Sequence, residues 1–291
     1  MYYLSEVITN KIEAFLGKDI VEVQAVSGGD INEARLISTQ DGATYFVKVN
    51  SGANSLPLFR TELRGLALLH QHAPKQLYVP RILTAEDAGD AAFLLLEYIQ
   101  KGMVTPGFWD NFGRGLAELH RATNTRFGLD HSNFIGRLPQ SNDPHATWPE
   151  FYTRRRLLPQ GKLAYENSLF DLKDMQHLER LCKRLGDIYP VESPALIHGD
   201  LWNGNYLIHQ NGKAVLIDPS VSYSHREMDL AMSRLFGGFP AEFYAAYNEQ
   251  FALTPGWEER LPIGQLYYLL VHLNMFGTGY LAGVRRIIRQ F

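Results

Sequence analysis

The chain has 291 residues, enough for one large domain or two of moderate size, and its 45% hydrophobic and 20% charged residues are ordinary for a soluble globular protein. A net charge of −3 and an isoelectric point near 6.4 indicate neither a nucleic-acid partner nor a membrane surface. The single cysteine, Cys182, excludes an intrachain disulfide. Because no signal-peptide pattern is present and no apolar run reaches the ~18 residues of a membrane span, we expect a cytoplasmic protein.

The first hundred residues predict a β-rich segment with few helices. Apolar residues at helical spacing from Leu4 to Leu16, followed by Gly17, predict an N-terminal helix. A longer helix is predicted from about Asn54 to His72. Short apolar or alternating segments predict strands at 21–25, 34–37, 45–49 and 93–96, with turns at 27–30 and 41–42.

The remainder of the chain predicts a mainly helical segment. Helices are expected at 108–121, 148–166, 171–185, 226–236, 241–251 and 263–290, the last one broken near Gly277 and Gly279. Residues 196–218 predict a compact strand–loop–strand unit between these helices. The basic run Arg154–Arg156 is interpreted as a solvated helix face. We therefore predict an α+β fold with a small β-rich lobe at 1–99 and a larger helical lobe at 100–291.

The strand–loop–strand unit carries a pattern that fits phosphoryl transfer from ATP. Asp200 and Asn205 stand five residues apart, as do the catalytic aspartate and the metal-binding asparagine of kinase loops. Asp218 follows the apolar segment 214–217, where a carboxylate can hold Mg²⁺ on ATP phosphates. The motif His198-Gly199-Asp200 alone is no more than a turn with a capping aspartate. The ordered set with both spacings is much more specific.

The N-terminal segment contains two further parts of such a site. Lys48 lies within an apolar strand, and Glu62 follows in the next helix, which matches the ion pair that positions the α- and β-phosphates of ATP. A turn between two predicted strands can cover phosphates with its backbone N–H groups. This turn consists of Gly28, Gly29, Asp30, Ile31 and Asn32.

From Val21 to Arg289 the chain resembles the fructosamine kinase (ketosamine-3-kinase) family, whose relatives are the aminoglycoside and choline kinases with their protein-kinase-like fold. The motifs described above carry this resemblance, together with 134–136 and 226–231. The continuation of the His-Gly-Asp motif, Leu201 to Asn205, and the tract 134–136 point to ketosamine kinases in particular.

The resemblance implies a role for each matched residue. Asp200 becomes the catalytic base, Asn205 and Asp218 become Mg²⁺ ligands, and Lys48 with Glu62 positions ATP, which the turn at 28–32 covers. The hinge beside adenine is implied at Glu97, Tyr98 and Ile99. Some family members carry a cysteine in the nucleotide loop; Asp30 occupies that position here, which puts loop-based disulfide regulation in doubt.

The resemblance also implies a ketoamine acceptor, free or protein-bound, phosphorylated on the third hydroxyl of its sugar so that the adduct is released and the protein is deglycated. Trp202 is two residues past Asp200, where its indole can stack on a sugar, and Tyr223 is a second candidate for acceptor contact. Aromatic residues beside such loops often belong to the core instead. Asp229 is expected to brace the catalytic loop by accepting backbone hydrogen bonds.

Three alternatives were weighed against this interpretation. The same core motifs serve aminoglycoside- and choline-type kinases, so these motifs do not fix the acceptor. A non-catalytic ATP-binding pseudokinase is the main non-enzyme alternative, although a scaffold does not need all five polar site residues. A metal or serine hydrolase is disfavoured because neither a His-x-x-x-His helix nor Gly-x-Ser-x-Gly is present. The oligomeric state is left open.

Overall fold

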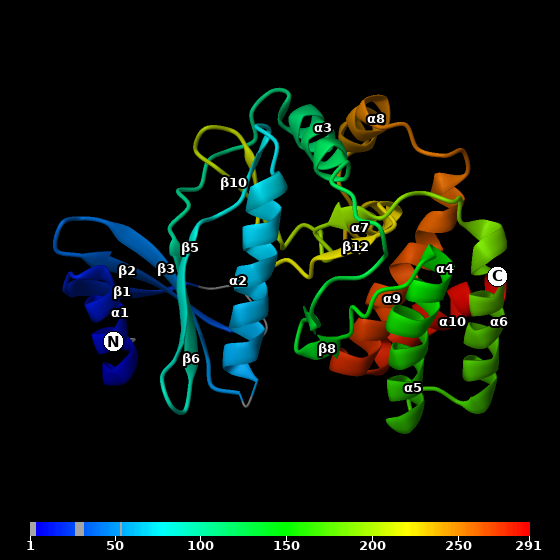
Figure 1. Cartoon of the computed structure of the whole chain (residues 1–291), viewed down its shortest axis with the longest axis horizontal. Coiled ribbons are helices and arrows are strands. Elements are labelled where there is room, and N and C mark those ends of the chain that lie inside the picture. The colour runs from blue at the N-terminus through cyan, green and yellow to red at the C-terminus, as the bar shows by residue number, and fades with distance from the viewer. Residues whose placement is uncertain (1–3, 27–31, 53) are drawn as a thin grey trace.

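A five-stranded antiparallel sheet is the framework of the N-terminal part of the chain, at the left of Figure 1. The structure is a computed structural model that describes residues 4–26, 32–52 and 54–291. The strand order in the sheet is β1–β2–β3–β6–β5. The strands are β1 (Ile20–Val26), β2 (Glu33–Thr39), β3 (Thr44–Asn50), β5 (Ile82–Asp87) and β6 (Ala92–Glu97).

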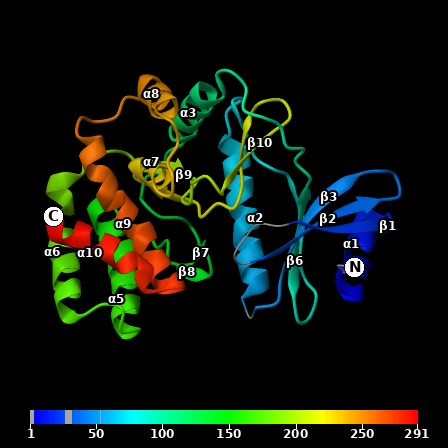
Figure 2. The same ribbon diagram turned by 180° about the vertical axis from the view of Figure 1, so that it is seen from behind.

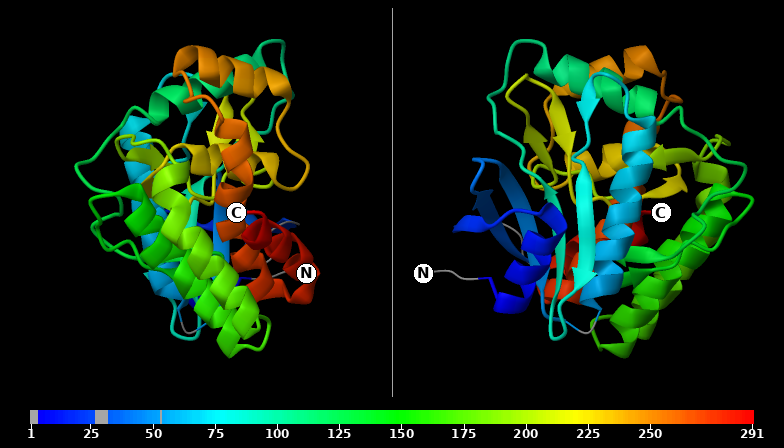
Figure 3. Two further views of the ribbon diagram at one scale, coloured as in Figure 1. Left: turned by 90° about the vertical axis from the view of Figure 1, so that its right-hand side faces the viewer. Right: turned by 60° about the vertical axis from the view of Figure 1, so that its left-hand side comes forward.

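Two helices cover the two faces of this sheet (Figures 1 and 3). α1 (Glu6–Leu16) packs on the face that presents Val47, and α2 (Ser55–His72) packs on the face that presents Leu94. Successive residues of a strand point to opposite faces, so Lys48 points toward α2, away from α1. The pleat of β3 therefore directs the lysine side chain toward the helix that carries Glu62.

The C-terminal part is mainly helical, and its helices surround a second apolar core (Figure 1). Residues 98–107 connect the two parts, and the lobe boundary predicted after residue 99 falls in this connection and stays a prediction. The helices are α3 (Phe108–Leu119), α4 (Trp148–Phe151), the π-helix η1 (Tyr152–Leu157), α5 (Leu158–Glu166), α6 (Leu172–Ile188), α7 (Glu227–Arg234), α8 (Ala241–Gln250), α9 (Trp257–Phe276), the 3₁₀-helix η2 (Thr278–Tyr280) and α10 (Leu281–Gln290).

Short strands place two loops side by side between the lobes. β9 pairs with β12, and β10 pairs with β11, which in turn pairs in parallel with β4. The loop at 198–205 joins β9 to β10, and the loop at 217–221 joins β11 to β12. The short strands are β4 (Leu77–Tyr78), β7 (Asn133–Ile135), β8 (Leu138–Gln140), β9 (Ala195–Ile197), β10 (Tyr206–Ile208), β11 (Ala214–Leu216) and β12 (Ser222–Ser224).

The predicted α+β, two-lobed architecture is confirmed, and the errors concern element boundaries. The last long helix was predicted to start at residue 263, but α9 starts at Trp257 and continues through Pro262. The segment 148–166 was predicted as one helix, but its middle is the π-helix η1. The predicted break at Gly277 is confirmed, because Gly277 has a φ of 92° between α9 and η2. No helix within the described ranges combines the length and the apolar character that a membrane span requires.

Candidate active site

Lys48 joins the two lobes through a pair of carboxylates. Its Nζ donates to Glu62 Oε1 at 2.7 Å, which confirms the predicted contact, and it also donates to Asp218 Oδ1. Lys48 and Glu62 are 8% and 9% exposed. Burial disfavours the ammonium, but the charges of Asp218 and Glu62 outweigh this effect and hold the pKa of Lys48 above its usual value. The result is a charged lysine fixed at the boundary between the lobes.

Asn205 fixes Asp200 at the tip of the catalytic loop, 198–205. Its Nδ2 donates both to the backbone O and to Oδ2 of Asp200, each at 2.8 Å. This use of the amide nitrogen leaves the side-chain oxygen of Asn205 as a donor atom for a cation. Burial raises the pKa of Asp200 to about 7, with smaller contributions from the charges of Asp218 and Asp229, although the hydrogen bond from Asn205 opposes the shift.

Asp229, at the start of α7, braces the catalytic loop from beneath, as predicted. It is fully buried, and it accepts hydrogen bonds from the backbone N–H of His198 at 2.7 Å and of Gly199 at 2.8 Å. His120 donates to it from Nε2 at 3.1 Å, and the hydroxyl of Tyr247 lies 2.8 Å from Nδ1 of the same ring. Although burial disfavours its charge, these donors and the nearby histidines keep the pKa of Asp229 below its usual value.

His198 ties the catalytic loop to the loop that carries Asp218. Its Nε2 donates to the carbonyl of Ile217 at 2.9 Å, so Nδ1 of the neutral ring is free to accept from the backbone N–H of Asp200 at 3.2 Å. Burial lowers the pKa of His198, which favours this neutral form. Asp200 and Asp218 are therefore held at a fixed separation by one imidazole.

Gly199 allows these two loops to approach each other. Its φ is +84°, and a Cβ at this position would lie 2.0 Å from the carbonyl oxygen of Ser220. The backbone N–H of Ser220 in turn donates to the carbonyl of His198 at 2.9 Å. Only glycine satisfies both the backbone conformation and the close packing.

Aromatic side chains gather beside the catalytic loop around Trp202. The Trp202 ring contacts Phe236 with centroids 5.9 Å apart, and Phe236 contacts His272 at 4.8 Å. Tyr280 closes the cluster, at 5.1 Å from the His272 ring. Phe236 is 37% exposed and has a φ of 55°, a conformation in which bulky residues are rare. The cluster thus forms a partly exposed apolar surface next to Asp200.

The remaining predicted acceptor residue, Tyr223, is not supported by the structure. It is 9% exposed and lies on β12, where its backbone pairs with Leu196 and Gly128. Its side chain belongs to the main apolar core, because β12 is enclosed between β9 and the surrounding chain. Trp202 keeps its predicted role as a proposal, and Tyr223 does not.

The predicted hinge residues lie where β6 ends. The carboxylate of Glu97 is occupied, since it accepts from the Tyr78 hydroxyl at 2.8 Å and from the backbone N–H of Arg81 at 2.7 Å. Tyr98 is 40% exposed and Ile99 is buried. The backbone at 97–99 is therefore what this segment can offer to a base, and its hinge role stays a prediction.

Most of the predicted nucleotide loop cannot be placed. Gly28, Gly29, Asp30 and Ile31 lie outside the described residues. Asn32, at the start of β2, accepts a hydrogen bond from Asn50 Nδ2 at 2.8 Å.

Sequence reasoning missed several residues around the site. His120 and Tyr247 gave no local signal, because their partner Asp229 is 109 residues away from His120 in the sequence. His272 lies in an apolar helix, where a lone histidine carries no motif. For Phe236, the only signal was the following Gly-Gly pair, which indicates a turn.

Comparison with known proteins gives consistent matches over nearly the whole chain. The family model described as fructosamine kinase matches residues 4–291. A "Probable ketoamine kinase" of Lactiplantibacillus plantarum is 41% identical over 276 residues, which cover 94% of this chain and 95% of the relative. A chloroplastic protein-ribulosamine 3-kinase of Oryza sativa is 34% identical over 94% of this chain and 79% of its own length. The crystal structure of a candidate fructosamine-3-kinase from Thermobifida fusca superposes with a TM-score of 0.87 at 33% identity, covering 97% of both chains.

Proposed function

Because the chain belongs to the fructosamine kinase family, with a protein-kinase-like fold, we propose that it transfers the γ-phosphoryl group of ATP to a sugar hydroxyl of a ketoamine. The expected acceptors are fructosamine or ribulosamine adducts of lysine, and their phosphorylation would start protein deglycation. The observation that carries this proposal is the single connected set of Asp200, Asn205, Asp218, Lys48 and Glu62. The predicted cytoplasmic location stays a prediction.

Asp200 is the residue proposed to accept the proton of the acceptor hydroxyl. As the hydroxyl oxygen bonds to the γ-phosphorus, the bond to the β–γ bridging oxygen breaks, ADP leaves, and the proton moves to the carboxylate of Asp200. A carboxyl pKa of about 7 suits a group that must accept and then release a proton near neutral pH. Asn205 orients Asp200 through its two hydrogen bonds, and Lys48 is positioned to hold the α- and β-phosphates.

Asn205 and Asp218 suit Mg²⁺ by the chemistry of their donor atoms. Mg²⁺ prefers hard oxygen ligands and usually keeps phosphate and water ligands beside one or two from the protein. The Asn205 side-chain oxygen and the Asp218 carboxylate fit this preference. When bound, the ion would neutralise phosphate charge. Asp218 has a φ of 54°, and its carboxylate meets Lys48, so the same aspartate joins the proposed cation site to the phosphate-binding lysine.

The aromatic cluster of Trp202, Phe236, His272 and Tyr280 is the proposed acceptor surface. Sugar rings present apolar C–H faces that pack well on aromatic rings, and a protonated amine is attracted to the same rings by cation–π interaction. A ketoamine contains both groups. The position of Trp202, two residues from Asp200 on one loop, would bring the sugar hydroxyl to the base.

A panel of acceptors assayed with Mg·ATP tests this proposal. kcat/KM is measured for ribulose-lysine, fructose-lysine, an aminoglycoside and choline. The proposal requires the ketoamines to be turned over best. Turnover no better than that of choline would remove the ketoamine assignment and favour the aminoglycoside- or choline-type alternative. Binding of ATP without transfer to any of the four acceptors would favour a pseudokinase.

A further inference from the structure

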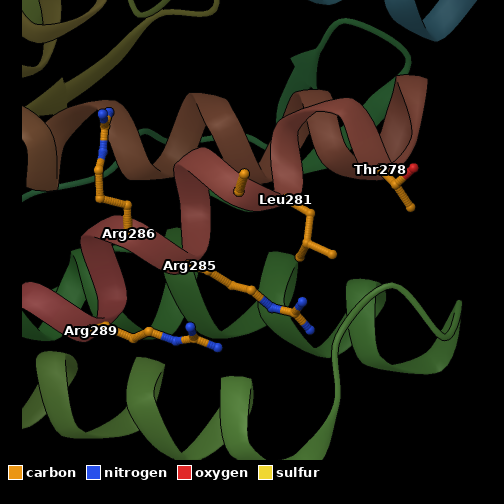
Figure 4. A pocket seen from close by; sticks show the side chains of 6 residues that line it. Thr278, Leu281, Arg285, Arg286 and Arg289 are labelled. Carbon is orange, nitrogen blue, oxygen red and sulfur yellow. The ribbon is translucent and has the colours of Figure 1, made fainter.

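The last helix carries arginines that the proposed chemistry does not use. An open hollow of about 490 Å³ along α10 is lined by Thr278, Leu281, Ala282, Arg285, Arg286 and Arg289 (Figure 4). Arg285 is committed to the buried Asp174, with Nη2 and Oδ2 2.7 Å apart. Within the described part of the chain, Arg286 and Arg289 form no ion pair, and both are exposed. Two guanidinium groups are thus available to an anionic ligand.

The arrangement of these side chains suits several separated charges. Figure 4 shows Arg286 extending to one side of α10, while Arg285 and Arg289 extend to the other. Guanidinium groups that converge on one point bind a single phosphate or carboxylate, and these do not converge. With a rise of ~1.5 Å per residue, 281 and 289 are ~12 Å apart along the helix, about the length of four residues of extended peptide. An extended acidic segment fits this spacing.

The hollow begins next to the proposed acceptor surface. Thr278, which lines the hollow, belongs to the same short helix η2 as Tyr280. The Tyr280 ring lies 6.5 Å from Phe236, which contacts Trp202 of the catalytic loop. Figure 2 shows α10 leading from the end of α9 near β7 and β8 toward α6. A chain bound along α10 would therefore lead into the aromatic cluster.

We propose that the α10 arginine cluster, Arg286 and Arg289, docks an acidic segment of a protein acceptor beside the lysine that carries the ketoamine. This inference rests on the proposed function and adds a substrate preference to it. The whole chain has a net charge of −3, so an acidic partner requires a local region of opposite charge. α10 supplies this region close to the catalytic loop, and its buried face of Val284, Ile287 and Ile288 anchors it to the lobe.

Synthetic peptides test the proposal. Each contains one ribulose-lysine flanked by four residues on either side, either Asp-rich or with Asn at the same positions, and free ribulose-lysine is the reference acceptor. kcat/KM is measured at low and at physiological salt for the wild type, for Arg286→Ala/Arg289→Ala and for Arg286→Glu/Arg289→Glu. Arg154→Ala is the matched control, since Arg154 is a 65% exposed arginine outside the cluster.

The wild type should prefer the acidic peptide by about 2- to 10-fold at low salt, as expected for two exposed charge pairs, and the preference should shrink with added salt. The alanine pair should lose this preference while keeping the kcat/KM of free ribulose-lysine, and the glutamate pair should disfavour the acidic peptide. Equal use of both peptides by the wild type, or a preference that survives in both double variants, would overturn the docking proposal. Absence of activity on free ribulose-lysine would instead overturn the proposed function.

Discussion

Replacing Asp229 by asparagine tests the brace under the catalytic loop with little change in shape. The carboxylate accepts three N–H donors, from His198, Gly199 and His120. An asparagine has one acceptor oxygen and turns an NH₂ group toward at least one of these donors. One buried N–H then stays unpaired, which costs about 1–3 kcal/mol, and the remaining bonds lose their charge assistance, about 1 kcal/mol each. The free energy of unfolding should therefore fall by about 3–5 kcal/mol.

Two measurements on Asp229→Asn check this expectation. Urea unfolding gives the loss of stability, and differential scanning calorimetry should show a Tm lower by about 6–15 °C. kcat should fall on the order of 10²-fold, because small displacements of a positioned base have effects of this size. Asp130→Asn is the matched control, since the Asp130 side chain is 74% exposed, and it should change neither quantity appreciably. Wild-type stability and kcat in Asp229→Asn would refute the bracing role.

Three further predictions concern the lysine, the loop glycine and a buried histidine. Lys48→Met should lower kcat/KM by on the order of 10²-fold in steady-state assays, because the phosphates lose their buried cation. Lys162→Met, at a 73% exposed position, should not. Gly199→Ala should lower the free energy of unfolding by at least about 2 kcal/mol in urea, since its Cβ would meet the Ser220 carbonyl. Gly186→Ala, in α6 with open space around it, should raise that energy by about 0.5–1 kcal/mol; the same sign for both would contradict the packing argument. Burial lowers the pKa of His225 to about 4, so the native state stays neutral while the unfolded chain gains a proton below pH ~6.5. Stability is therefore lost as the pH falls from ~6.5 toward 4, about 2 kcal/mol by pH 5, and urea unfolding of His225→Gln at pH 7.5 and 5 should show a smaller loss.

The sequence predicted the parts of the site that depend on short-range spacing. Asp200 and Asn205 lie on one loop, and the alternation of β3 directs Lys48 toward α2, so these contacts follow from local geometry. The brace by Asp229 was also predictable, because a buried carboxylate requires donors and the catalytic loop supplies backbone N–H groups. The two-lobed arrangement followed from the change from strand to helix patterns along the chain.

Contacts between distant segments could not be predicted. Arg156 was interpreted as part of a solvated face, but it is 3% exposed, it donates to the carbonyl of Ser141 at 2.7 Å, and it lies over the ring of Phe151. This interpretation was wrong because the run of arginines shows charge but not what α9 places over it. The π-helix around Arg156 changes the helical period locally, which apolar spacing does not reveal.

The central claim is that Asp200 receives the proton of a ketoamine hydroxyl during phosphoryl transfer from ATP. The most direct measurement is the single-turnover rate of Asp200→Asn with Mg·ATP and ribulose-lysine, together with the Kd of Mg·ATP for the same protein. Loss of a general base predicts a rate lower by about 10²–10⁴-fold. The Kd should stay close to that of the wild type, because the base acts on the acceptor. A near-normal single-turnover rate in Asp200→Asn would contradict the claim.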